Sequence, residues 1–309
     1  MKRKPRTKLP LSKFKSLFET DEKCRAFLEQ ASWGDTPACA HCGSVKVWRR
    51  TKRHLFECGD CGKQFSVLVG TPMQDTKLPL TKWFLAIYLL AETSKGVSAN
   101  WLKDAIGVTY KTAWFLGHRI RRMMDGGDTL LTGVVEADET YMGGKRRRGD
   151  PPRKRGRGTP KKAVFVAVQR GGQVRAGMME NVTADAVKAR LDEWVSKDAT
   201  LMTDELNVYR GLGRIYGWHF SVNHNAEEFV RDVDGLAVHN NSAESFNSTL
   251  KRAHTGVYHY MSPKHLLRYV SECAFRWNAR KMDTLGRLSG MLHVGFGRVI
   301  PYKVLTAQA

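Results

Sequence analysis

Three carboxylates, Asp138, Asp204 and Glu244, occur in surroundings that could build a divalent-metal site. Asp138 ends the apolar segment GVVEAD and Asp204 ends the apolar segment ATLMTD, so both are expected at the ends of strands. Glu244 lies in VHNNSAESFNSTLKR, which is expected to be helical. Carboxylate oxygens suit Mg²⁺, and three such residues could hold two ions about 4 Å apart, the arrangement for in-line phosphoryl transfer. They are therefore candidate catalytic acids.

Two of these acids have alternative interpretations. Asn241 and Glu244 are three residues apart, which is the spacing of a capping box at the start of a helix. Glu136 shares a strand face with Asp138 by the two-residue alternation and could take its place, whereas Glu139 points to the opposite face. Both alternatives remain open from the residues alone.

Four cysteines form two C-x-x-C pairs that are separated by 15 residues, which is typical of a zinc ribbon. Gly43 and Gly62 follow the pairs and allow the tight turns that aim the sulfurs at one ion. Six cysteines distributed in this way suit a reducing compartment and one metal site better than a disulfide framework. The predicted ligands of one structural Zn²⁺ are Cys39, Cys42, Cys58 and Cys61.

The charge of the chain favours a nucleic-acid partner. Lys and Arg number 51 against 30 Asp and Glu, a formal net charge of +21. The longest apolar run, Trp83 to Ala91, is far shorter than the roughly 20 residues that cross a bilayer. The basic N-terminus lacks the pattern of a signal peptide. We therefore expect a cytoplasmic protein with no membrane partner.

Residues 97–124 have the pattern of a helix-turn-helix. Leu102 and Ile106 lie one turn apart, Gly107 breaks the first helix, and Thr109 can cap the second. The buried stripe of the second helix is expected to consist of Ala113, Leu116, Gly117 and Ile120. The cations left to meet DNA phosphates or base edges are then Lys111, Arg119, Arg121 and Arg122. An ordinary helical hairpin would show a similar pattern.

A strongly basic segment, residues 145–162, contains ten Lys or Arg and one acid, Asp150. Such a segment is expected to be a solvated, disordered loop in the free protein. Because it follows Asp138 closely, we expect it to become ordered on DNA. Its first four cations, which are candidate DNA contacts, are Lys145, Arg146, Arg147 and Arg148.

A family resemblance joins these motifs. The chain resembles insertion-sequence DDE transposases of the group that carries an N-terminal zinc ribbon. The resemblance spans about residues 14–282 and keeps its order throughout. It rests on the segments CAHCG…ECGDCGKQFSVLVGT, TKLPLTKWFLAIYLL, KTAW…HRIRRMM, VEADETYMGGK, TDELNVY and HNNSAESFNSTLKR.

The resemblance implies a ribonuclease-H-like catalytic domain. Asp138 would lie on its first strand, Asp204 at the end of its fourth strand and Glu244 on the helix that follows. The intervals of 65 and 39 residues between these acids leave room for that topology. Lys251, two helical turns after Glu244, would act near the DNA end, with Arg252 beside it.

The third metal ligand has other candidates. Some relatives replace the third acid, so Asn241 or His239 could contribute a ligand instead. Glu272 is a rival carboxylate on the next helix. Its aromatic surroundings favour an ion pair with Arg276 or Arg280.

The implied function is that of a DNA transposase. It would bind the terminal inverted repeats of its element and use two Mg²⁺ or Mn²⁺ ions for strand cleavage and strand transfer. Double-stranded transposon ends and target DNA would be its partners, and holding two ends together implies a homodimer or a larger assembly. The alternative is a non-catalytic DNA-binding regulator, a degenerate transposase. A tyrosine or serine recombinase, which would form a covalent adduct with DNA, is a third option.

The expected fold class is a multi-domain α+β protein. A zinc ribbon and a helical helix-turn-helix region precede an α/β ribonuclease-H-like catalytic domain with a mixed sheet. The expected boundaries are 1–36 for a basic helical lead, 37–72 for the ribbon, 78–125 for the helix-turn-helix, 130–282 for the catalytic domain and 283–309 for a C-terminal tail.

Overall fold

The computed structural model describes residues 7–50, 53–127, 129–143, 161–205, 207–209, 211, 215–222 and 230–307. Within this part the chain forms two compact units, which divide after Gly126 and again after Asn278. The first unit therefore takes residues from both ends of the chain, and the second is continuous.

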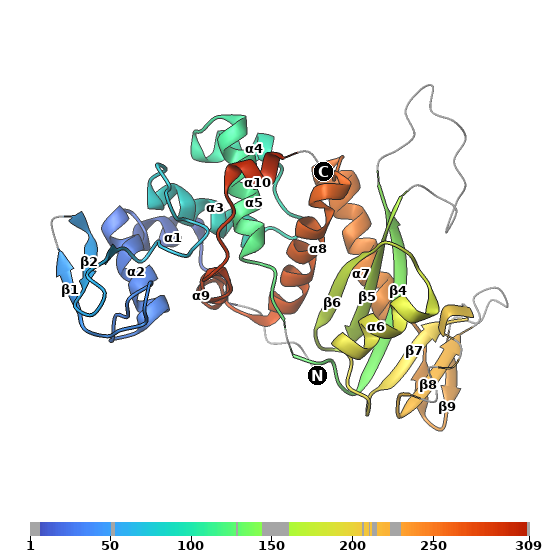
Figure 1. The fold of residues 1–309 in the computed structure, drawn as a ribbon. Coiled ribbons are helices and arrows are strands. Elements are labelled where there is room, and N and C mark those ends of the chain that lie inside the picture. The colour runs from blue at the N-terminus through green and yellow to red at the C-terminus, as the bar shows by residue number, and fades with distance from the viewer. Residues whose placement is uncertain are drawn as a thin grey trace. The chain divides into compact units, whose positions relative to one another are not determined.

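The N-terminal part of the first unit combines two helices with a small antiparallel sheet (Figure 1). Its elements are α1 (Leu11–Leu17), α2 (Asp21–Trp33), β1 (Val47–Arg50), β2 (Leu55–Cys58) and β3 (Gln64–Phe65). Strand β2 pairs with both β1 and β3. Three aromatic rings from α2, β2 and β3 form the small core: Trp33 contacts Phe56 edge-on at 5.1 Å between centroids, and Phe56 stacks on Phe65 at 5.7 Å.

The remainder of the first unit is helical. Its longer helices are α3 (Leu80–Glu92), α4 (Ala99–Ile106), α5 (Tyr110–Arg122) and α9 (Thr284–Gly295), with the short α10 (Tyr302–Thr306) after them. Helix α3 is buried on most sides, which explains the apolar run WFLAIYLLA without a membrane. In the described part of the chain, no helix combines the length and the apolarity needed to cross a membrane.

The segment expected to be a C-terminal tail is mostly helical. Helix α9 packs against α2 and α3, and its Arg287 is buried and donates hydrogen bonds to the carbonyl oxygens of Ala91 and Ala279. Leu305 of α10 is fully buried. Residues 279–307 are therefore an integral part of the first unit. Their contacts with α2 and α3 are long-range, so the local sequence pattern does not indicate them.

The second unit is built on a five-stranded mixed sheet with the strand order β6-β5-β4-β7-β8. The strands are β4 (Val134–Met142), β5 (Lys162–Gln169), β6 (Val174–Met179), β7 (Thr200–Asp204) and β8 (Trp218–Val222). Strand β5 is antiparallel to β4 and β6, whereas β7 is parallel to both β4 and β8. This mixed sheet confirms the predicted ribonuclease-H-like fold, with Asp204 ending the fourth strand of the sheet in chain order.

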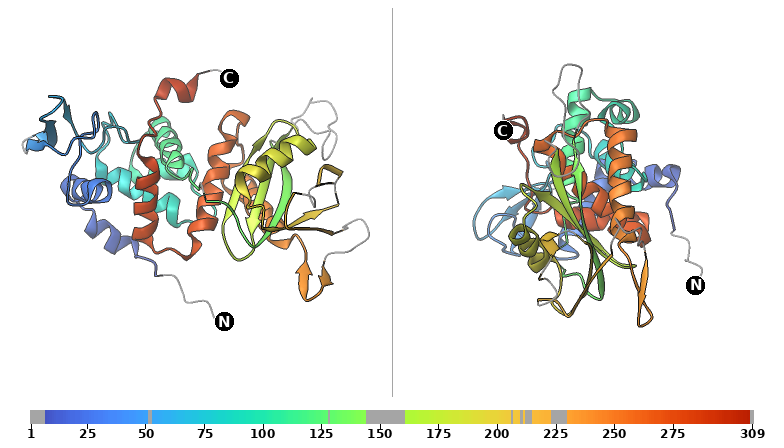
Figure 2. Two further views of the ribbon diagram at one scale, coloured as in Figure 1. Left: turned by 60° about the horizontal axis from the view of Figure 1, so that its bottom comes forward. Right: turned by 90° about the vertical axis from the view of Figure 1, so that its right-hand side faces the viewer.

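Helices cover both faces of this sheet (Figures 1 and 2). Helix α6 (Ala184–Trp194) packs on one face, and α7 (Asn241–Ala253) and α8 (Pro263–Asn278) pack on the other. The right-hand view of Figure 2 shows the strands between these layers. Strand β5 is buried on both sides, which explains its unbroken apolar sequence AVFVAV. A hairpin of β9 (Arg231–Val233) and β10 (Leu236–Val238) leads into α7.

Candidate active site

Asp138 and Asp204 lie on neighbouring parallel strands at the centre of the sheet. Glu136 of β4 pairs with Met202 of β7, and two residues further on the same register brings Asp138 level with Asp204. Neighbouring strands are about 4.8 Å apart, and residues two apart share a face. The structure therefore brings these two predicted acids together on the face that carries α7.

Asp138 is held by one hydrogen bond to each carboxylate oxygen. The backbone N–H of Glu139 donates to Oδ1 at 2.8 Å, and Nδ2 of Asn247 donates to Oδ2 at 2.7 Å. Burial, followed by the negative charges of Glu139 and Asp204, raises the pKa of Asp138 to about 7. A carboxyl group crowded by like charges and held away from water is a ready site for a cation.

Glu139 lies on the opposite face of β4, as strand alternation predicts. Its Oε2 accepts a hydrogen bond of 2.8 Å from the hydroxyl of Tyr209, which is buried in the short 3₁₀ helix after β7. Burial and the neighbouring acids raise the pKa of Tyr209 well above 10, so the hydroxyl remains a donor. This contact ties the strand of Asp138 to the segment that follows Asp204. Sequence reasoning missed it, because the partners are 70 residues apart.

Glu136 anchors the start of α7 and does not join the two aspartates. Its carboxylate has 0% exposure and accepts a 2.8 Å hydrogen bond from Nε of Arg170. It also accepts bonds from the backbone N–H groups of Ser242 and Ala243 and from the Ser242 hydroxyl. His239 Nδ1 lies 3.3 Å from Oε1 of the same carboxylate. Because its oxygens are occupied by these donors, the alternative in which Glu136 replaces Asp138 is not supported.

The start of α7 lacks the predicted capping box. The N-cap residue is Asn240, not Asn241, and its side chain makes no capping bond. Asn240 Nδ2 donates instead to the carbonyl of Ala137, at 3.2 Å. Because Glu136 supplies the cap from β4, Glu244 is not needed as a cap.

Glu244 lies on the exposed edge of α7, one turn before Asn247 and two turns before Lys251. The three side chains follow one side of the helix, as predicted for Glu244 and Lys251. We consider groups of three or more His, Cys, Asp or Glu whose ligand atoms all lie within 4.8 Å of one another. Within the described ranges, the four zinc-ribbon cysteines are the one such group. Glu244 therefore does not join Asp138 and Asp204 in a cluster of that size.

Glu272, the rival carboxylate, belongs to a separate buried ion pair. Its oxygens accept hydrogen bonds from Arg276 and, at 2.7 and 2.8 Å, from the hydroxyl of Tyr258. The predicted pairing with Arg276 is confirmed. That pairing explains why a carboxylate occurs in the middle of an apolar helix.

The polar atoms around Asp138 fit a hard divalent cation. Besides the two aspartates, the side-chain oxygen of Asn247, whose nitrogen binds Asp138, is buried and has no hydrogen-bond partner within the described residues. Carboxylate and amide oxygens are the donor set that Mg²⁺ takes in proteins. Asn247 could have been singled out in the sequence, because it is a polar residue in the apolar stripe of its helix.

The four cysteines of the ribbon lie in a zinc-binding arrangement. Sulfur atoms are 3.7 Å apart in the Cys39–Cys61 pair and 3.5 Å apart in the Cys42–Cys58 pair. Tetrahedral Zn–S bonds of about 2.3 Å place sulfurs about 3.8 Å apart, so the spacing fits one ion. The backbone N–H groups of Cys61 and Asp60 lower the pKa of Cys58 to about 6, which favours the thiolate. The arrangement supports a zinc site at the four predicted cysteines.

Comparisons with known proteins match both parts of this description. Residues 19–64 match the family model of a transposase zinc-ribbon domain, and residues 130–278 match that of an ISXO2-like transposase domain. The chain is 30% identical over 262 residues to an uncharacterized protein in the transposable element ISH50 of Halobacterium salinarum. That alignment covers 78% of this chain and 86% of the relative.

The chain belongs to the ISXO2-like transposases.

The helical hairpin of this transposase has the predicted turn. Gly107 ends α4 in the left-handed region with φ of 62°, and the hydroxyl of Thr109 accepts a hydrogen bond from the N–H of Thr112 at the start of α5. Leu102 and Ile106 are buried, as expected. The predicted stripe of α5, Ala113, Leu116, Gly117 and Ile120, is buried as well.

Two of the four cations predicted to face DNA from this hairpin are not on the surface. Arg119 is 7% exposed and Arg121 is 4% exposed. The Arg119 guanidinium lies over the rings of Trp83 and Phe115 and donates to the carbonyl of Gln74 at 2.6 Å. Burial lowers its pKa to about 10. The expectation of exposed side chains at these two positions is wrong, because α5 packs on more sides than one apolar stripe implies.

The other two cations remain at least partly accessible. Lys111 is exposed at the start of α5, with its Nζ 4.9 Å from the ring centroid of Tyr302 in α10. Arg122 is half-buried and pairs with Asp125 at 2.6 Å. Lys251 and Arg252 are exposed on α7. The basic positions Lys145, Arg146, Arg147 and Arg148 lie outside the described residues.

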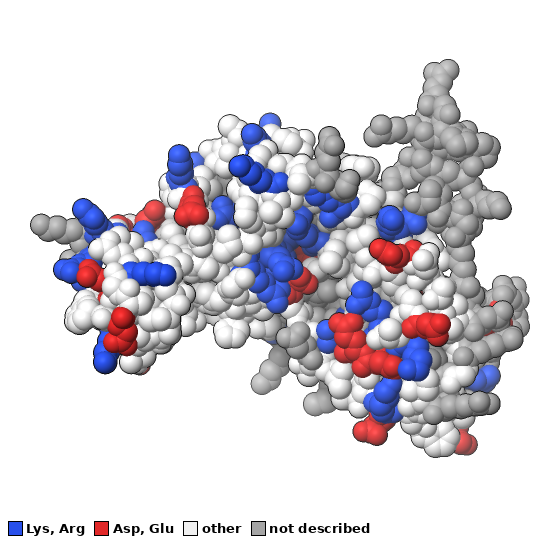
Figure 3. Space-filling view, viewed as in Figure 1, with Lys and Arg blue, Asp and Glu red and all other residues white. Residues whose placement is uncertain are grey.

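Charges of both signs alternate over α6 on the face shown in Figure 3. Lys188 pairs with Asp192, and Arg190 pairs with Glu193, both at 2.8 Å. Because these charges are paired, the described surface over α6 is not a uniformly basic patch of the kind that binds a DNA backbone.

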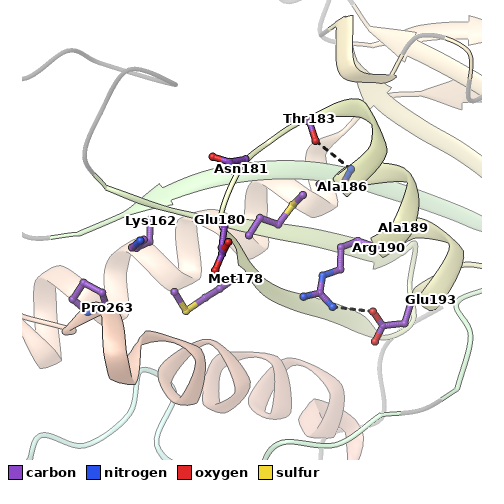
Figure 4. Close-up of a pocket in the computed structure, with 11 residues that line it drawn as sticks. Lys162, Met178, Glu180, Asn181, Thr183, Ala186, Ala189, Arg190, Glu193 and Pro263 are labelled. Atoms are coloured by element: carbon purple, nitrogen blue, oxygen red, sulfur yellow. Dashed lines mark hydrogen bonds and ion pairs between the residues drawn. The ribbon is translucent and has the colours of Figure 1, made fainter. Parts of the chain in front are cut away.

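A surface groove of about 850 Å³ lies between α6, the edge strand β6 and the start of α8 (Figure 4). None of the three candidate acids lines it. Its lining residues are Lys162, Met178, Met179, Glu180, Asn181, Thr183, Ala186, Ala189, Arg190, Glu193 and Pro263.

Proposed function

We propose that this transposase binds the terminal inverted repeats of its element, cleaves DNA there and joins the freed strand to target DNA. The supporting observation is the pair of aspartates, Asp138 and Asp204, on neighbouring central strands beside the anchored helix that carries Glu244. The reaction is phosphoryl transfer and needs no protein nucleophile. The conclusion rests on the site geometry together with the membership of the family.

Asp138 and Asp204 would bind two divalent ions, Mg²⁺ or Mn²⁺, with Glu244 as the third carboxylate. Such ions, when bound, activate a water or a DNA 3′-hydroxyl and stabilise the leaving oxygen. The protein fixes Asp138 through two hydrogen bonds and sets the distance to α7 through Glu136. Lys251, on the same side of α7 as Glu244, would bind a phosphate near the reacting bond.

The first unit would supply DNA recognition. Its zinc ribbon holds one structural Zn²⁺, and its hairpin carries Lys111 at the exposed start of α5. Lys251 and Arg252 would add phosphate contacts from the second unit, and the basic segment 145–162 would add further cations. Strand transfer requires two element ends, so we infer a homodimer or larger assembly on DNA in the cytoplasm.

The direct test is metal-dependent cleavage of duplexes that carry the native element ends. Wild type should cut with Mg²⁺ or Mn²⁺, and Asp204→Asn and Glu244→Gln should each lose about 100-fold or more of the rate while still binding DNA. Asp198→Asn, a change at an exposed acid in the same unit, is the matched control and should cut normally. If Glu244→Gln cuts at the wild-type rate, Glu244 is not the third ligand.

The same assay separates the transposase from the regulator. A protein that binds the element ends specifically but cuts with neither ion would contradict the proposed reaction. That result would support a DNA-binding protein that has kept the fold without the activity. A covalent protein–DNA adduct would instead indicate a recombinase with a serine or tyrosine nucleophile.

A further inference from the structure

Asn247 is a buried amide inside the apolar stripe of α7. It is 4% exposed and lies between Phe246 and Leu250, which pack into the core between the sheet and α8. A buried polar side chain weakens a core unless its hydrogen bonds are made. Packing alone would favour an apolar residue here, so the amide calls for another explanation.

The contacts of this amide are directed to the candidate catalytic acid. Nδ2 donates to Oδ2 of Asp138 at 2.7 Å, across 109 residues of sequence. The amide oxygen is buried and has no partner within the described residues. The amide nitrogen therefore binds Asp138, and the amide oxygen remains a hydrogen-bond acceptor beside it.

We propose that Asn247 is a positioning residue for Asp138, a proposal that rests on the proposed function. Together with the N–H of Glu139, it holds the carboxylate by one donor on each oxygen. A carboxylate has about four acceptor positions, so two remain for cations. Asn247 thereby fixes which way the free lone pairs of Asp138 point.

The same contact fixes the position of Glu244 relative to Asp138, and both residues are candidate metal ligands. Glu136 bonds to Ser242 and Ala243 before Glu244, and Asp138 bonds to Asn247 one turn after it. Strand β4 therefore holds α7 on both sides of Glu244. Loss of the second contact frees Asp138 to rotate and loosens the distance from Asp138 to Glu244.

The test compares Asn247→Leu and Asn247→Ala with wild type in the full-length, zinc-loaded protein. Leu keeps the volume without the donor, and Ala removes both the donor and the volume. Asn278→Leu is the matched control, because Asn278 is another amide of the same unit whose two hydrogen bonds go to the backbone of Val174, away from the acids.

Two readouts are needed. The first is Mn²⁺ binding to the free protein, followed by electron paramagnetic resonance, with Asp138→Asn as the background. The second is the metal concentration for half-maximal cleavage. The dissociation constant for Mn²⁺ and the metal concentration for half-maximal cleavage should both rise about 10- to 100-fold in the Asn247 variants, as expected when the partner of a metal ligand is removed. DNA affinity should stay unchanged, and Asn278→Leu should match wild type in both readouts.

The outcomes separate this proposal from the proposed function. If wild type binds Mn²⁺ and the Asn247 variants bind it equally well, Asn247 is only a structural residue and this inference is wrong. If wild type binds Mn²⁺ but does not cut, the cleavage proposal fails, and the Mn²⁺ titration still decides the role of Asn247. If wild type binds no Mn²⁺ above the Asp138→Asn background, the inference about Asn247 is wrong, and the cleavage assay alone decides the proposed function.

Discussion

At the scale of single residues, Asp138 has surroundings unlike water: it is buried beside the negative charges of Glu139 and Asp204. The sequence predicts its position and that of Asp204, because each ends an apolar run, and it predicts the cluster of Cys58 with three other cysteines from their spacing. The burial of Arg119 does not follow from the sequence of its helix, because that sequence does not say on how many sides the helix is covered. The contact of Asn247 with Asp138 spans 109 residues, so no local pattern indicates it.

Asp138 gives the clearest pH dependence. Its pKa of about 7 in the folded protein compares with an ordinary value of 3.8, so the folded protein binds more protons than the unfolded chain between about pH 4 and pH 7. The contribution of Asp138 to the free energy of unfolding therefore decreases as the pH rises through that window, and it stays at this lower value at higher pH. The cause is burial of the charge, followed by repulsion from Glu139 and Asp204.

Asp138→Asn should therefore stabilise the protein without added divalent ions. The gain in the free energy of unfolding should reach at most about 4 kcal/mol at pH 8 and shrink to about 2 kcal/mol at pH 5. Urea unfolding of both proteins at both pH values measures it, and the zinc site, common to both, cancels in the comparison. Asp198→Asn should show no such pH-dependent gain. A gain that is equal at the two pH values would contradict the raised pKa.

At the scale of elements, strand and helix types followed from the sequence, but their attachments did not. The alternation of β4 correctly separated Glu136 and Asp138 from Glu139. Nothing local indicated that Glu136 would cap α7, because a cap is normally sought within the same few residues. The capping-box pattern of Asn241 and Glu244 was a plausible local signal that a tertiary contact overrode.

Glu136→Gln should detach the start of α7 from β4. It removes the charge that Arg170 and two backbone N–H groups share, so it should cost about 3–5 kcal/mol of the free energy of unfolding. Ser242→Ala removes only the hydroxyl bond and should cost about 1 kcal/mol.

Hydrogen exchange at the amides of Ser242 and Ala243, with urea unfolding, measures this effect. Exchange at both amides should accelerate in Glu136→Gln and change little in Ser242→Ala. Equal cost in the two variants would show that the carboxylate is not the anchor.

At the scale of the whole molecule, the sequence predicted the order of the ribbon, hairpin and sheet. It did not predict that residues 279–307 return to the first unit. The contacts of α9 with α2 and α3 join segments far apart in the chain, and the bond from Arg287 to the carbonyl of Ala91 spans 196 residues. No local sequence pattern indicates such a contact.

A fragment of residues 7–126 should consequently be unstable alone. Without α9, the buried faces of α2 and α3 meet water, so the fragment should aggregate or unfold at a lower temperature than the same fragment joined by a flexible linker to residues 279–307. Circular dichroism melting with zinc present measures the difference. Residues 127–278, which form a continuous unit, should fold alone and serve as the control. Equal melting of the two N-terminal fragments would contradict an integral role for α9.

The return of α9 also fixes an order of events during synthesis. Chains leave the ribosome N-terminus first, so α2 and α3 emerge early, but the helix that covers them emerges only after the entire second unit. The unit made first is thus the one completed last. A message that breaks off before residue 279 would yield a folded sheet unit joined to an N-terminal unit in which the faces of α2 and α3 that contact α9 are uncovered.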